Sequence, residues 1–335
     1  MGSDALLQLD NITQIFKWHN KPVRAVDGVS LTVNEGETLC LVGESGCGKT
    51  TVGKIACGLR KPTAGRVLFR GKDIWAMDKK EFNDYRLAVQ IIHQDPYASL
   101  NPVQTVNQIL GAPLERHNLV KGRTQLRDRI YELMDTVNLT PIDDFYDKHP
   151  HQLSGGQRQR LSIARALTVN PSVIIADESV SMVDVSIRVS LLKTLANLRD
   201  RLGVAFLFIT HDLAVAKYFA WNGRIGVMYV GRVVELGRTP DVVNESQHPY
   251  TRALLGAVPE ADPNLTRTKE RIALRSQDIP SLVALPTGCT FHPRCPLFVA
   301  GTCDRIEPAL LATGPTHEVA CHVATGKVVE RERAA

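Results

Sequence analysis

Gly43-Glu44-Ser45-Gly46-Cys47-Gly48-Lys49-Thr50 fits the pattern G-x-x-x-x-G-K-[ST], which is typical of a loop that holds phosphate groups. The loop follows a short apolar run at 38–42 and precedes residues 52–59, whose composition is helical. Its glycines let backbone N–H groups turn inward around phosphates, and the following helix presents its positive end. We expect Lys49 to reach the β- and γ-phosphates and the Thr50 hydroxyl to face Mg²⁺. Strand, loop and helix together predict a nucleotide site.

Two carboxylates, Asp177 and Glu178, follow an apolar strand predicted at 173–176. Catalytic and ligand-binding groups gather at strand ends in α/β proteins. We expect Asp177 to hold Mg²⁺ through a water molecule. We expect Glu178 to polarise the attacking water, as the general base in phosphoryl transfer to water. An ordinary acidic pair on the surface is the alternative, and the phosphate loop makes that alternative much less favoured.

A second helix start suited to an anion lies about 105 residues after the phosphate loop. Leu153-Ser154-Gly155-Gly156-Gln157 places a serine cap and two glycines before residues 158–166, which have helical spacing. The serine hydroxyl, the free backbone N–H groups and the helix dipole all favour an anion there. Two phosphate-facing helix starts in one chain suggest sites completed between two copies. A plain capped helix is the alternative.

The LSGGQ segment closely resembles the signature of the ATP-binding-cassette (ABC) ATPases, and further family motifs follow in the family's order. Gln94, after a strand predicted at 89–92, resembles the glutamine that contacts Mg²⁺ and senses the transmembrane partner. Residues 181–184 (SMVD) occupy the position of the family's D-loop. His211 is similar to the switch histidine that contacts the γ-phosphate. Phe16 stands where the family places an aromatic ring that stacks on adenine.

The resemblance implies a catalytic set of Glu178, His211 and Gln94, and it implies that Thr50 and Gln94 bind Mg²⁺. The residues expected to contact ATP and Mg²⁺ are Phe16, Gly43, Ser45, Gly46, Cys47, Gly48, Lys49, Thr50, Thr51, Gln94, Asp177, Ser154, Gly155, Gly156, Gln157 and Asp184. The chain departs from the family at two places, with Ser179 where a proline is usual and SMVD where SALD is usual. Neither change removes a group that touches phosphate or Mg²⁺, so both bear on rate and on coupling across the dimer.

The segments HPYTRALL at 248–255 and DPYASLNP at 95–102 resemble ATPase subunits of oligopeptide, dipeptide and nickel importers, and the likeness covers residues 5 to about 323. It implies a peripheral subunit at the cytoplasmic face of the inner membrane. Such a subunit pairs with a second ABC ATPase, identical or similar, and docks on two transmembrane permease subunits. An extracytoplasmic solute-binding protein supplies the cargo: a peptide, nickel, an opine or an oligosaccharide.

The other interpretation is a soluble ABC ATPase that acts on nucleic acid or ribosomes. Such proteins commonly carry a long coiled-coil insertion or two cassettes in one chain, and neither is seen in this sequence. Lys and Arg are scattered at a net charge of +5, without the clustered basic footprint of a nucleic-acid binder. A phosphotransferase on the same loop is a further alternative, against which the LSGGQ segment argues.

Four late cysteines follow the spacing C-x5-C-x7-C-x17-C, which differs from the paired C-x2-C of a zinc ribbon. They are Cys289, Cys295, Cys303 and Cys321. Ligation by thiolates alone suits either zinc or an iron–sulfur cluster. Some peptide-importer ATPases that this chain resembles carry a [4Fe–4S] cluster on similarly spaced cysteines, which favours the cluster. Zinc, with His292 or His322 as a substitute ligand, and unligated buried thiols are the alternatives.

Composition and patterning predict an α/β fold. The resemblance implies a P-loop NTPase core sheet with an N-terminal antiparallel β subdomain and a helical subdomain, plus a small irregular C-terminal extension with the four-cysteine site. We expect an ABC cassette at 1–255, with its helical subdomain at about 95–167, and an accessory region at 256–335. Short strands are predicted at 6–9 and 29–33, buried parallel strands at 89–92, 173–176 and 204–209, and a hairpin around Gly231.

Length and hydropathy exclude several classes of protein. With 335 residues, 44% hydrophobic and 22% charged, the chain is long enough for two globular units and is not of the disordered type. The longest clean apolar stretch has six residues, at 204–209, far below the ~20 needed to span a bilayer. The first residues, MGSDALLQLD, lack the features of a secretory signal, so we expect the chain to stay in the cytosol.

Overall fold

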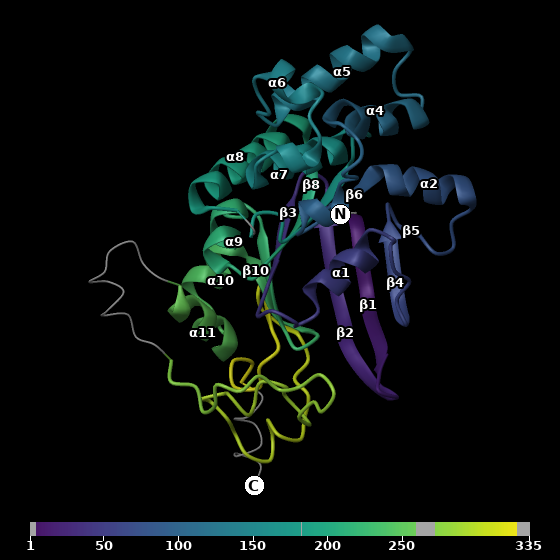
Figure 1. Ribbon diagram of the computed structural model, residues 1–335. Coiled ribbons are helices and arrows are strands. Elements are labelled where there is room, and N and C mark those ends of the chain that lie inside the picture. Colours follow the sequence, from purple (N-terminus) through teal and green to yellow (C-terminus); the bar gives the residue numbers. More distant parts are fainter. Residues whose placement is uncertain (1–4, 182, 259–271, 327–335) are drawn as a thin grey trace.

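The computed structural model describes residues 5–181, 183–258 and 272–326, which form a four-stranded antiparallel sheet and an eight-stranded mixed sheet (Figure 1). The antiparallel sheet, in the order β2-β1-β4-β5, contains β1 (Ala5–Trp18), β2 (Lys21–Asn34), β4 (Ala64–Phe69) and β5 (Lys72–Asp73). The mixed sheet, in the order β11-β12-β10-β9-β3-β8-β7-β6, contains β3 (Thr38–Val42), β6 (Val89–Ile92), β7 (Val173–Asp177), β8 (Ala205–Thr210), β9 (Arg224–Tyr229), β10 (Arg232–Arg238), β11 (Leu311–Gly314) and β12 (His317–Val319).

Helices cover the mixed sheet and build the helical part at one end of the molecule (Figure 1). They are α1 (Lys49–Ala56), α2 (Lys79–Ala88), α3 (Pro96–Ser99), α4 (Val106–Arg116), α5 (Gly122–Thr136), α6 (Ile142–Tyr146), α7 (Gly155–Leu167), α8 (Val185–Leu202), α9 (Leu213–Phe219), α10 (Thr239–Asn244) and α11 (Pro249–Ala257), with a short 3₁₀ turn at Pro150–Gln152. The predicted α/β fold with an antiparallel β subdomain is confirmed.

Strands β6, β7, β8, β3 and β9 run parallel, and this part of the sheet positions the site. Every residue of β3, β7 and β8 is buried, as expected for parallel strands covered on both faces. Because parallel strands end at the same edge, the loops after β3, β6, β7 and β8 meet there. The three predicted strands are present, although β6 at the edge of the sheet is half-buried at Gln90 and Ile91. The hairpin around Gly231, formed by β9 and β10, is confirmed.

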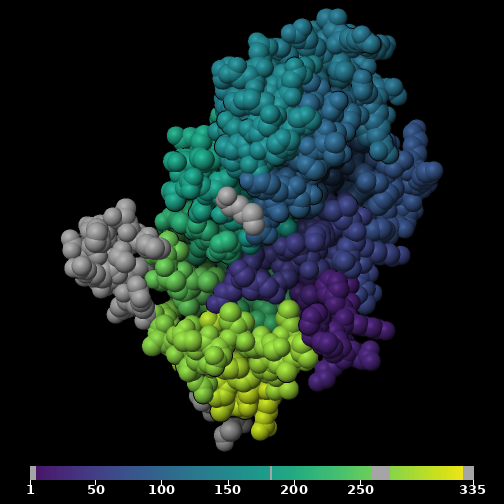
Figure 2. Space-filling model, viewed as in Figure 1, coloured from purple at the N-terminus to yellow at the C-terminus, as the bar shows by residue number. Residues whose placement is uncertain are grey.

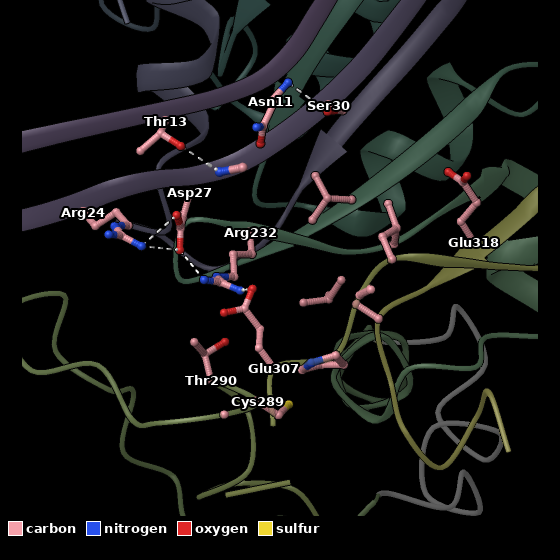
Figure 3. A pocket seen from close by; sticks show the side chains of 18 residues that line it. Asn11, Thr13, Arg24, Asp27, Ser30, Arg232, Cys289, Thr290, Glu307 and Glu318 are labelled. Atoms are coloured by element: carbon pink, nitrogen blue, oxygen red, sulfur yellow. Dashed lines mark hydrogen bonds and ion pairs between the residues drawn. The ribbon is translucent and has the colours of Figure 1, made fainter. Parts of the chain in front are cut away.

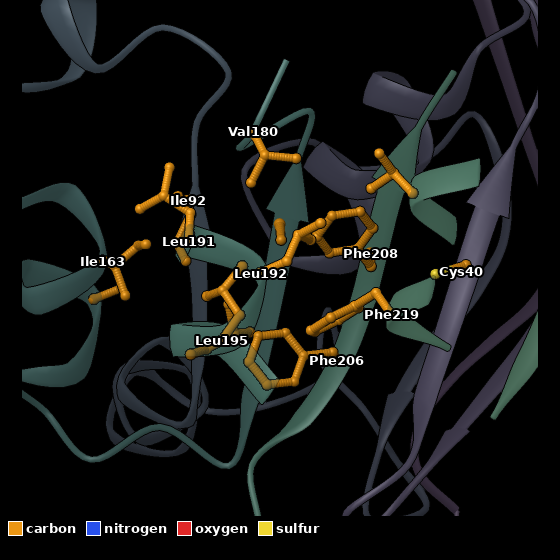
Figure 4. Packing of buried hydrophobic residues seen from close by; sticks show 14 of the residues in the cluster. Cys40, Ile92, Ile163, Val180, Leu191, Leu192, Leu195, Phe206, Phe208 and Phe219 are labelled. Carbon is orange, nitrogen blue, oxygen red and sulfur yellow. The ribbon is translucent and has the colours of Figure 1, made fainter. Parts of the chain in front are cut away.

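Aromatic and aliphatic side chains fill the space between the sheet and its helices (Figure 4). Phe206 and Phe208 of β8 face Phe219 of α9, with ring centroids 5.4 and 4.6 Å apart. Leu191 and Leu195 of α8 are completely buried in the same cluster. This packing fixes β8, whose last residues lead into the loop that carries His211.

The N-terminal sheet is larger than predicted. β1 and β2 run for 14 residues each and pair from Ala5 with Asn34 to Trp18 with Lys21, whereas the sequence indicated only 6–9 and 29–33. The strands continue beyond the apolar segment because main-chain pairing extends through exposed residues, interrupted by irregular register shifts. The hairpin turns at His19 and Asn20, which both have positive φ.

The described residues 272–326, here called the C-terminal region, join the main sheet. β12 pairs antiparallel with β10, Glu235 opposite Val319, and β11 pairs with β12. The region also lies against the N-terminal sheet: residues of β1 and β2 line a cavity of about 710 Å³ together with Cys289 and Glu307 (Figure 2, Figure 3).

Candidate functional site

The phosphate loop, residues 43–50, connects β3 to α1 and needs glycine at two positions. Gly43 has φ +154° and Gly48 has φ +105°, in the region that side chains rarely adopt. A Cβ on Gly43 would stand 2.1 Å from the carbonyl oxygen of Met228, and one on Gly48 would stand 2.2 Å from that of Ala25. Packing between the strands beneath the loop therefore holds its backbone in place.

Lys49 and Thr50 present the loop's polar groups at the sheet edge. The buried Lys49 ammonium donates to the carbonyl oxygens of Gly43 at 2.7 Å and Glu44 at 2.9 Å. The Thr50 hydroxyl donates to Oδ1 of Asp177 at 3.1 Å, so the sequence-predicted pair meets. Burial raises the pKa of Asp177 and Glu178 adds to the shift, while the bond from Thr50 opposes it. A buried carboxylate beside a hydroxyl is a fitting place for a cation.

The three predicted catalytic residues meet at the carboxylate of Glu178. Nε2 of Gln94 donates to its Oε2 at 2.9 Å, and Nδ1 of His211 lies 3.2 Å from its Oε1. Its N–H donates to the carbonyl of Ile209 at 2.9 Å, and its φ is +45°. Such backbone strain is common at functional sites. Gln94, Glu178 and His211 come from the loops after β6, β7 and β8, so the shared edge explains their meeting.

The predicted signature is a capped helix start in the structure. Ser154 caps α7: its Oγ accepts from the N–H of Gln157 at 3.3 Å, and the Gln157 side chain accepts from the N–H of Ser154 at 2.8 Å. Ser154 is exposed, and the space beside Gly155 is open. A Cβ on Gly156 would stand 2.6 Å from a side-chain carbon of Ile187, which explains the second glycine.

The two anion-facing helix starts lie in different parts of the chain. α7 packs on α3, α4, α5, α8 and β6, whereas α1 packs on β7, β8, β1 and β2. Asp184 stands exposed at the start of α8, and Met182 beside it lies outside the described residues. The structure thus joins Thr50 to Asp177 and Gln94 to Glu178 within one chain, and presents Ser154 elsewhere on the surface.

The remaining predicted residues lie around the loop. Ser45 and Gly46 are exposed, Cys47 is buried and Thr51 is half-buried in α1. Burial raises the pKa of Cys47, and the Lys49 ammonium partly offsets the rise. Phe16 lies on β1 with the guanidinium of Arg60, from the segment after α1, 4.9 Å from its ring centre.

Two residues that hold the phosphate loop were not predicted from the sequence. The hydroxyl of buried Tyr250, at the start of α11, accepts the N–H of Glu44 at 2.9 Å. The guanidinium of Arg294 donates to both carboxylate oxygens of Glu44, at 2.9 and 3.1 Å. The HPYTRALL motif was a signal for Tyr250, although not for its role. For Arg294 the only signal was its place between two cysteines.

Buried Glu235 of β10 ties the start of α11 to the C-terminal region. It accepts the N–H groups of Gln247 at 2.7 Å and His248 at 3.1 Å, and Nε2 of His317 lies 2.8 Å away. Burial lowers the pKa of His248 to about 4, against the attraction of Glu235. His248 stays neutral at physiological pH, with its Nδ1 accepting the N–H of Tyr250 at 3.1 Å.

The four cysteines of the C-terminal region lie near one another, and burial dominates their chemistry. Burial raises the pKa of Cys289 to about 11 and of Cys295 to about 12, and other cysteines of the set add to both shifts. Main-chain hydrogen bonds connect the cysteine segments: the N–H of Cys289 donates to the carbonyl oxygen of Cys303 at 2.8 Å, and the N–H of His292 donates to that of Cys289 at 3.0 Å.

Metal-binding geometry is not formed at these cysteines. Within residues 5–181, 183–258 and 272–326, no group of three or more His, Cys, Asp or Glu side chains is arranged to hold a metal ion. The rings of His292 and His322 lie against the backbone carbonyls of Cys289 and Ile306, each at 2.9 Å. Both rings are thereby engaged by the main chain.

Two protein families match parts of this chain. Residues 26–181 match the family described as ABC transporter, and residues 234–303 match the oligopeptide/dipeptide transporter C-terminal region. The oligopeptide transport ATP-binding protein OppF of Salmonella typhimurium is 44% identical over 90% of this chain and 88% of its own length. The chain belongs to the ABC transporter ATP-binding proteins of the oligopeptide and dipeptide type.

This ABC ATPase has further relatives of the same kind. The oligopeptide transport ATP-binding protein AppF of Bacillus subtilis is 42% identical over 90% of each chain. Among solved structures, the dimeric bacterial ABC transporter cassette MJ0796 covers 70% of this chain and 98% of its own, with 30% identity and a TM-score of 0.62. MJ0796 has also been solved after hydrolysis, bound to ADP and Pi.

Membership establishes the reaction class: the protein is an ATPase of the ABC family. The alternative of an ATPase acting on nucleic acid or ribosomes finds no support among these relatives, which are named as transport proteins. No helix in the described part of the chain is long and apolar enough to cross a membrane.

Proposed function

We propose that this ABC ATPase powers the import of peptides or similar small polar solutes. The observation that carries the hydrolytic part is the Glu178 carboxylate, held by Gln94 and His211 beside the Thr50–Asp177 pair. The import part rests on the C-terminal match at 234–303 and on relatives named as oligopeptide transport proteins.

The phosphate loop and Lys49 would bind the β- and γ-phosphates. Lys49 now donates to two loop carbonyls, and it can exchange those bonds for phosphate oxygens without moving far. Thr50 and Gln94 would hold Mg²⁺ with Asp177 behind them, because oxygen donors are what this ion prefers. When bound, Mg²⁺ would neutralise charge on the phosphate oxygens.

Glu178 would act as general base on the attacking water. Gln94 and His211 fix the two carboxylate oxygens, so the carboxylate is oriented before nucleotide arrives. His211 would then turn to the γ-phosphate. Phe16, with Arg60 at 4.9 Å, would stack on adenine.

A second ABC ATPase, identical or similar, would complete each site. Ser154 is exposed at the start of α7, ahead of Gly155, Gly156 and Gln157, and Asp184 is exposed at the start of α8. These groups would contact the nucleotide held on the partner's phosphate loop. The dimeric structure of MJ0796 supports this arrangement.

A basic groove beside the Gln94 loop would receive a permease. The groove, about 840 Å³, is lined by residues of α2, β6, α4 and α7. Its cationic lining consists of Lys79, Lys80, Arg86, Arg116 and Arg165. His93 also lines the groove, one residue before Gln94, so a loop seated there would act directly on the catalytic glutamine. Two permeases, with an extracytoplasmic solute-binding protein, would place the subunit at the cytoplasmic face of the inner membrane.

The four cysteines would hold a [4Fe–4S] cluster, with zinc as the alternative. Cys303 and Cys321 lie close enough to Cys289 and Cys295 to raise the pKa of both thiols, and a set of four neighbouring cysteines suits either group. Iron, sulfide and zinc analysis after anaerobic purification decides between them, and stoichiometric zinc would exclude the cluster.

The import proposal is tested by purifying the tagged chain from detergent-solubilised native membranes and identifying its companions by mass spectrometry. Two multi-span permeases are expected, and a second ATPase would show whether the dimer is mixed. Recovery of ribosomal, DNA-associated or other soluble proteins alone would overturn the proposal.

A further inference from the structure

The C-terminal region reaches the phosphate loop directly, through one arginine. Arg294 is 4% exposed, and its guanidinium contacts both carboxylate oxygens of Glu44, the second residue of the loop. One of its nitrogens also lies 3.4 Å from the hydroxyl of Tyr229. Because the buried guanidinium makes two hydrogen bonds to one carboxylate, the contact fixes the orientation of the Glu44 side chain as well as its distance from Arg294.

The same segment is anchored at the cysteine site. Arg294 lies between Cys289 and Cys295, directly before Cys295, and the N–H groups of His292 and Cys295 donate to the carbonyl oxygens of Cys289 at 3.0 Å and His292 at 3.3 Å. Both ends of the segment thus belong to the set of four cysteines, and its last residue before Cys295 touches the phosphate loop. Only a few rotatable bonds separate the four-cysteine site from the phosphate loop.

An aromatic cluster makes the connection stiff. The rings of Tyr229, Tyr250 and Phe291 are almost fully buried, with centroids 4.6 to 5.5 Å apart. Arg294 lies 5.7 Å from the ring centres of Tyr229 and Phe291. Because Tyr250 also accepts the N–H of Glu44, the cluster supports the loop at its main chain while Arg294 holds its side chain.

Glu44 connects these contacts with Arg294 and Tyr250 to the nucleotide site. Its carbonyl oxygen is one of the two acceptors of the Lys49 ammonium. A shift of Glu44 therefore moves an acceptor that competes with phosphate for Lys49. The loop is held from the C-terminal region at the residue whose carbonyl Lys49 must release.

We propose that Arg294 is a positioning residue of the nucleotide site, which couples ATP binding to the conformation of the Cys289–Cys295 segment through Glu44. The proposal deepens the proposed function, since it assumes that the phosphate loop binds ATP. Coupling between two sites is reciprocal. Because the contact orders the phosphate loop before nucleotide binds, its loss should weaken nucleotide binding, and by reciprocity bound nucleotide should change the conformation or protection of the segment.

The first test is a double-mutant cycle on the full chain, read as the dissociation constant of a non-hydrolysable ATP analogue with Mg²⁺. Arg294→Gln and Glu44→Gln should each weaken binding, by about five- to twentyfold. The double variant should bind no more weakly than either single variant, because both changes break one contact. Arg294→Lys should fall between, since it keeps the charge and loses the fork.

Glu307→Gln is the matched control. Glu307 pairs with Arg232, which also pairs with Asp27, so it joins the same C-terminal region to the cassette away from the phosphate loop (Figure 3). Binding within twofold of the unmodified chain is expected. Glu44→Gln keeps the experiment decisive if Arg294→Gln misfolds, because Glu44 is only partly buried and lies outside the C-terminal region.

The second test is hydrogen exchange by mass spectrometry with saturating analogue. The analogue should slow exchange of residues 43–50 in every variant, and of 289–295 in the unmodified chain and Glu307→Gln but not in Arg294→Gln. Unchanged affinity in Arg294→Gln or Glu44→Gln, additive losses, or protection of 289–295 without Arg294 would each overturn the coupling. Absence of protection at 43–50 in the unmodified chain would instead refute the nucleotide site.

Discussion

Replacing Glu178 by Gln tests the assignment of the general base. Glutamine has the same shape and can keep one of the two contacts, since its carbonyl oxygen can still accept from Gln94 or His211. The backbone at φ +45° bears a similar strain with either side chain. We therefore expect the fold to survive and the free energy of unfolding to change by less than about 1 kcal/mol.

The loss in turnover follows from the chemistry removed. A positioned general base contributes about 10²- to 10⁴-fold to a rate. At 1.36 kcal/mol for each tenfold step, the barrier should rise by about 3 to 5 kcal/mol. Binding should be spared, because the Lys49 ammonium and the Thr50 hydroxyl contact other groups. Removal of the Glu178 carboxylate charge also relieves repulsion toward the phosphates.

The assay is phosphate release by the purified, partner-containing complex at saturating ATP, run beside a direct measurement of ATP affinity. Turnover should fall at least about a hundredfold while the dissociation constant stays the same or decreases. Turnover within tenfold of the unmodified complex would refute the role given to Glu178. A large loss of affinity would show that the carboxylate holds the site together instead.

Three further predictions follow from the geometry. Gly48→Ala should lower the unfolding temperature and abolish binding of an ATP analogue, because φ is +105° and a carbonyl oxygen stands 2.2 Å from the new Cβ. Gly111→Ala in α4 is the control, because the new Cβ would meet only side-chain carbons at 3.6 Å or more. In the folded chain His248 stays neutral down to about pH 4, whereas in the unfolded chain it is protonated below about pH 6.5. Protons therefore favour the unfolded state in this range, and the free energy of unfolding should fall by about 3 kcal/mol from pH 6.5 to pH 4. Urea unfolding of His248→Asn, which can still cap α11, should lack that part of the pH dependence, and an unchanged slope would contradict it. Alkylation of buried Cys47 at pH 7 should be slow and should slow further with bound ATP, as measured by site-resolved mass spectrometry.

The catalytic edge could be predicted from the sequence because its signals are local. Continuous apolar runs mark β7 and β8, and the polar residues that follow them must meet once the strands are parallel. Glu178 was expected from its place after a predicted strand, whereas Gln94 and His211 were expected only from the resemblance to the ABC family. The glycines of the phosphate loop likewise indicate, from the sequence, positive φ angles that other residues rarely adopt.

The rest depends on contacts that no short pattern records. Arg294 and Glu44 are 250 positions apart, and neither lies in a segment whose hydrophobic periodicity would predict that they meet. The segment from 64 to 88 gave no prediction, although β4 completes a sheet and α2 begins with a capping box between Asp78 and Glu81. Tertiary pairing decides the ends of β1 and β2, since exposed and half-buried residues together make up more than half of their length.

The pairing of β12 with β10 has a consequence for how the protein is made. β10 ends at Arg238, and its partner β12 is complete only at Val319, about 80 residues later. At ~5–20 residues per second of synthesis, that edge of the sheet waits about 4 to 16 seconds for its partner. An unpaired strand edge is a template for association with other chains. The interval after β10 is therefore when the nascent protein most needs a chaperone.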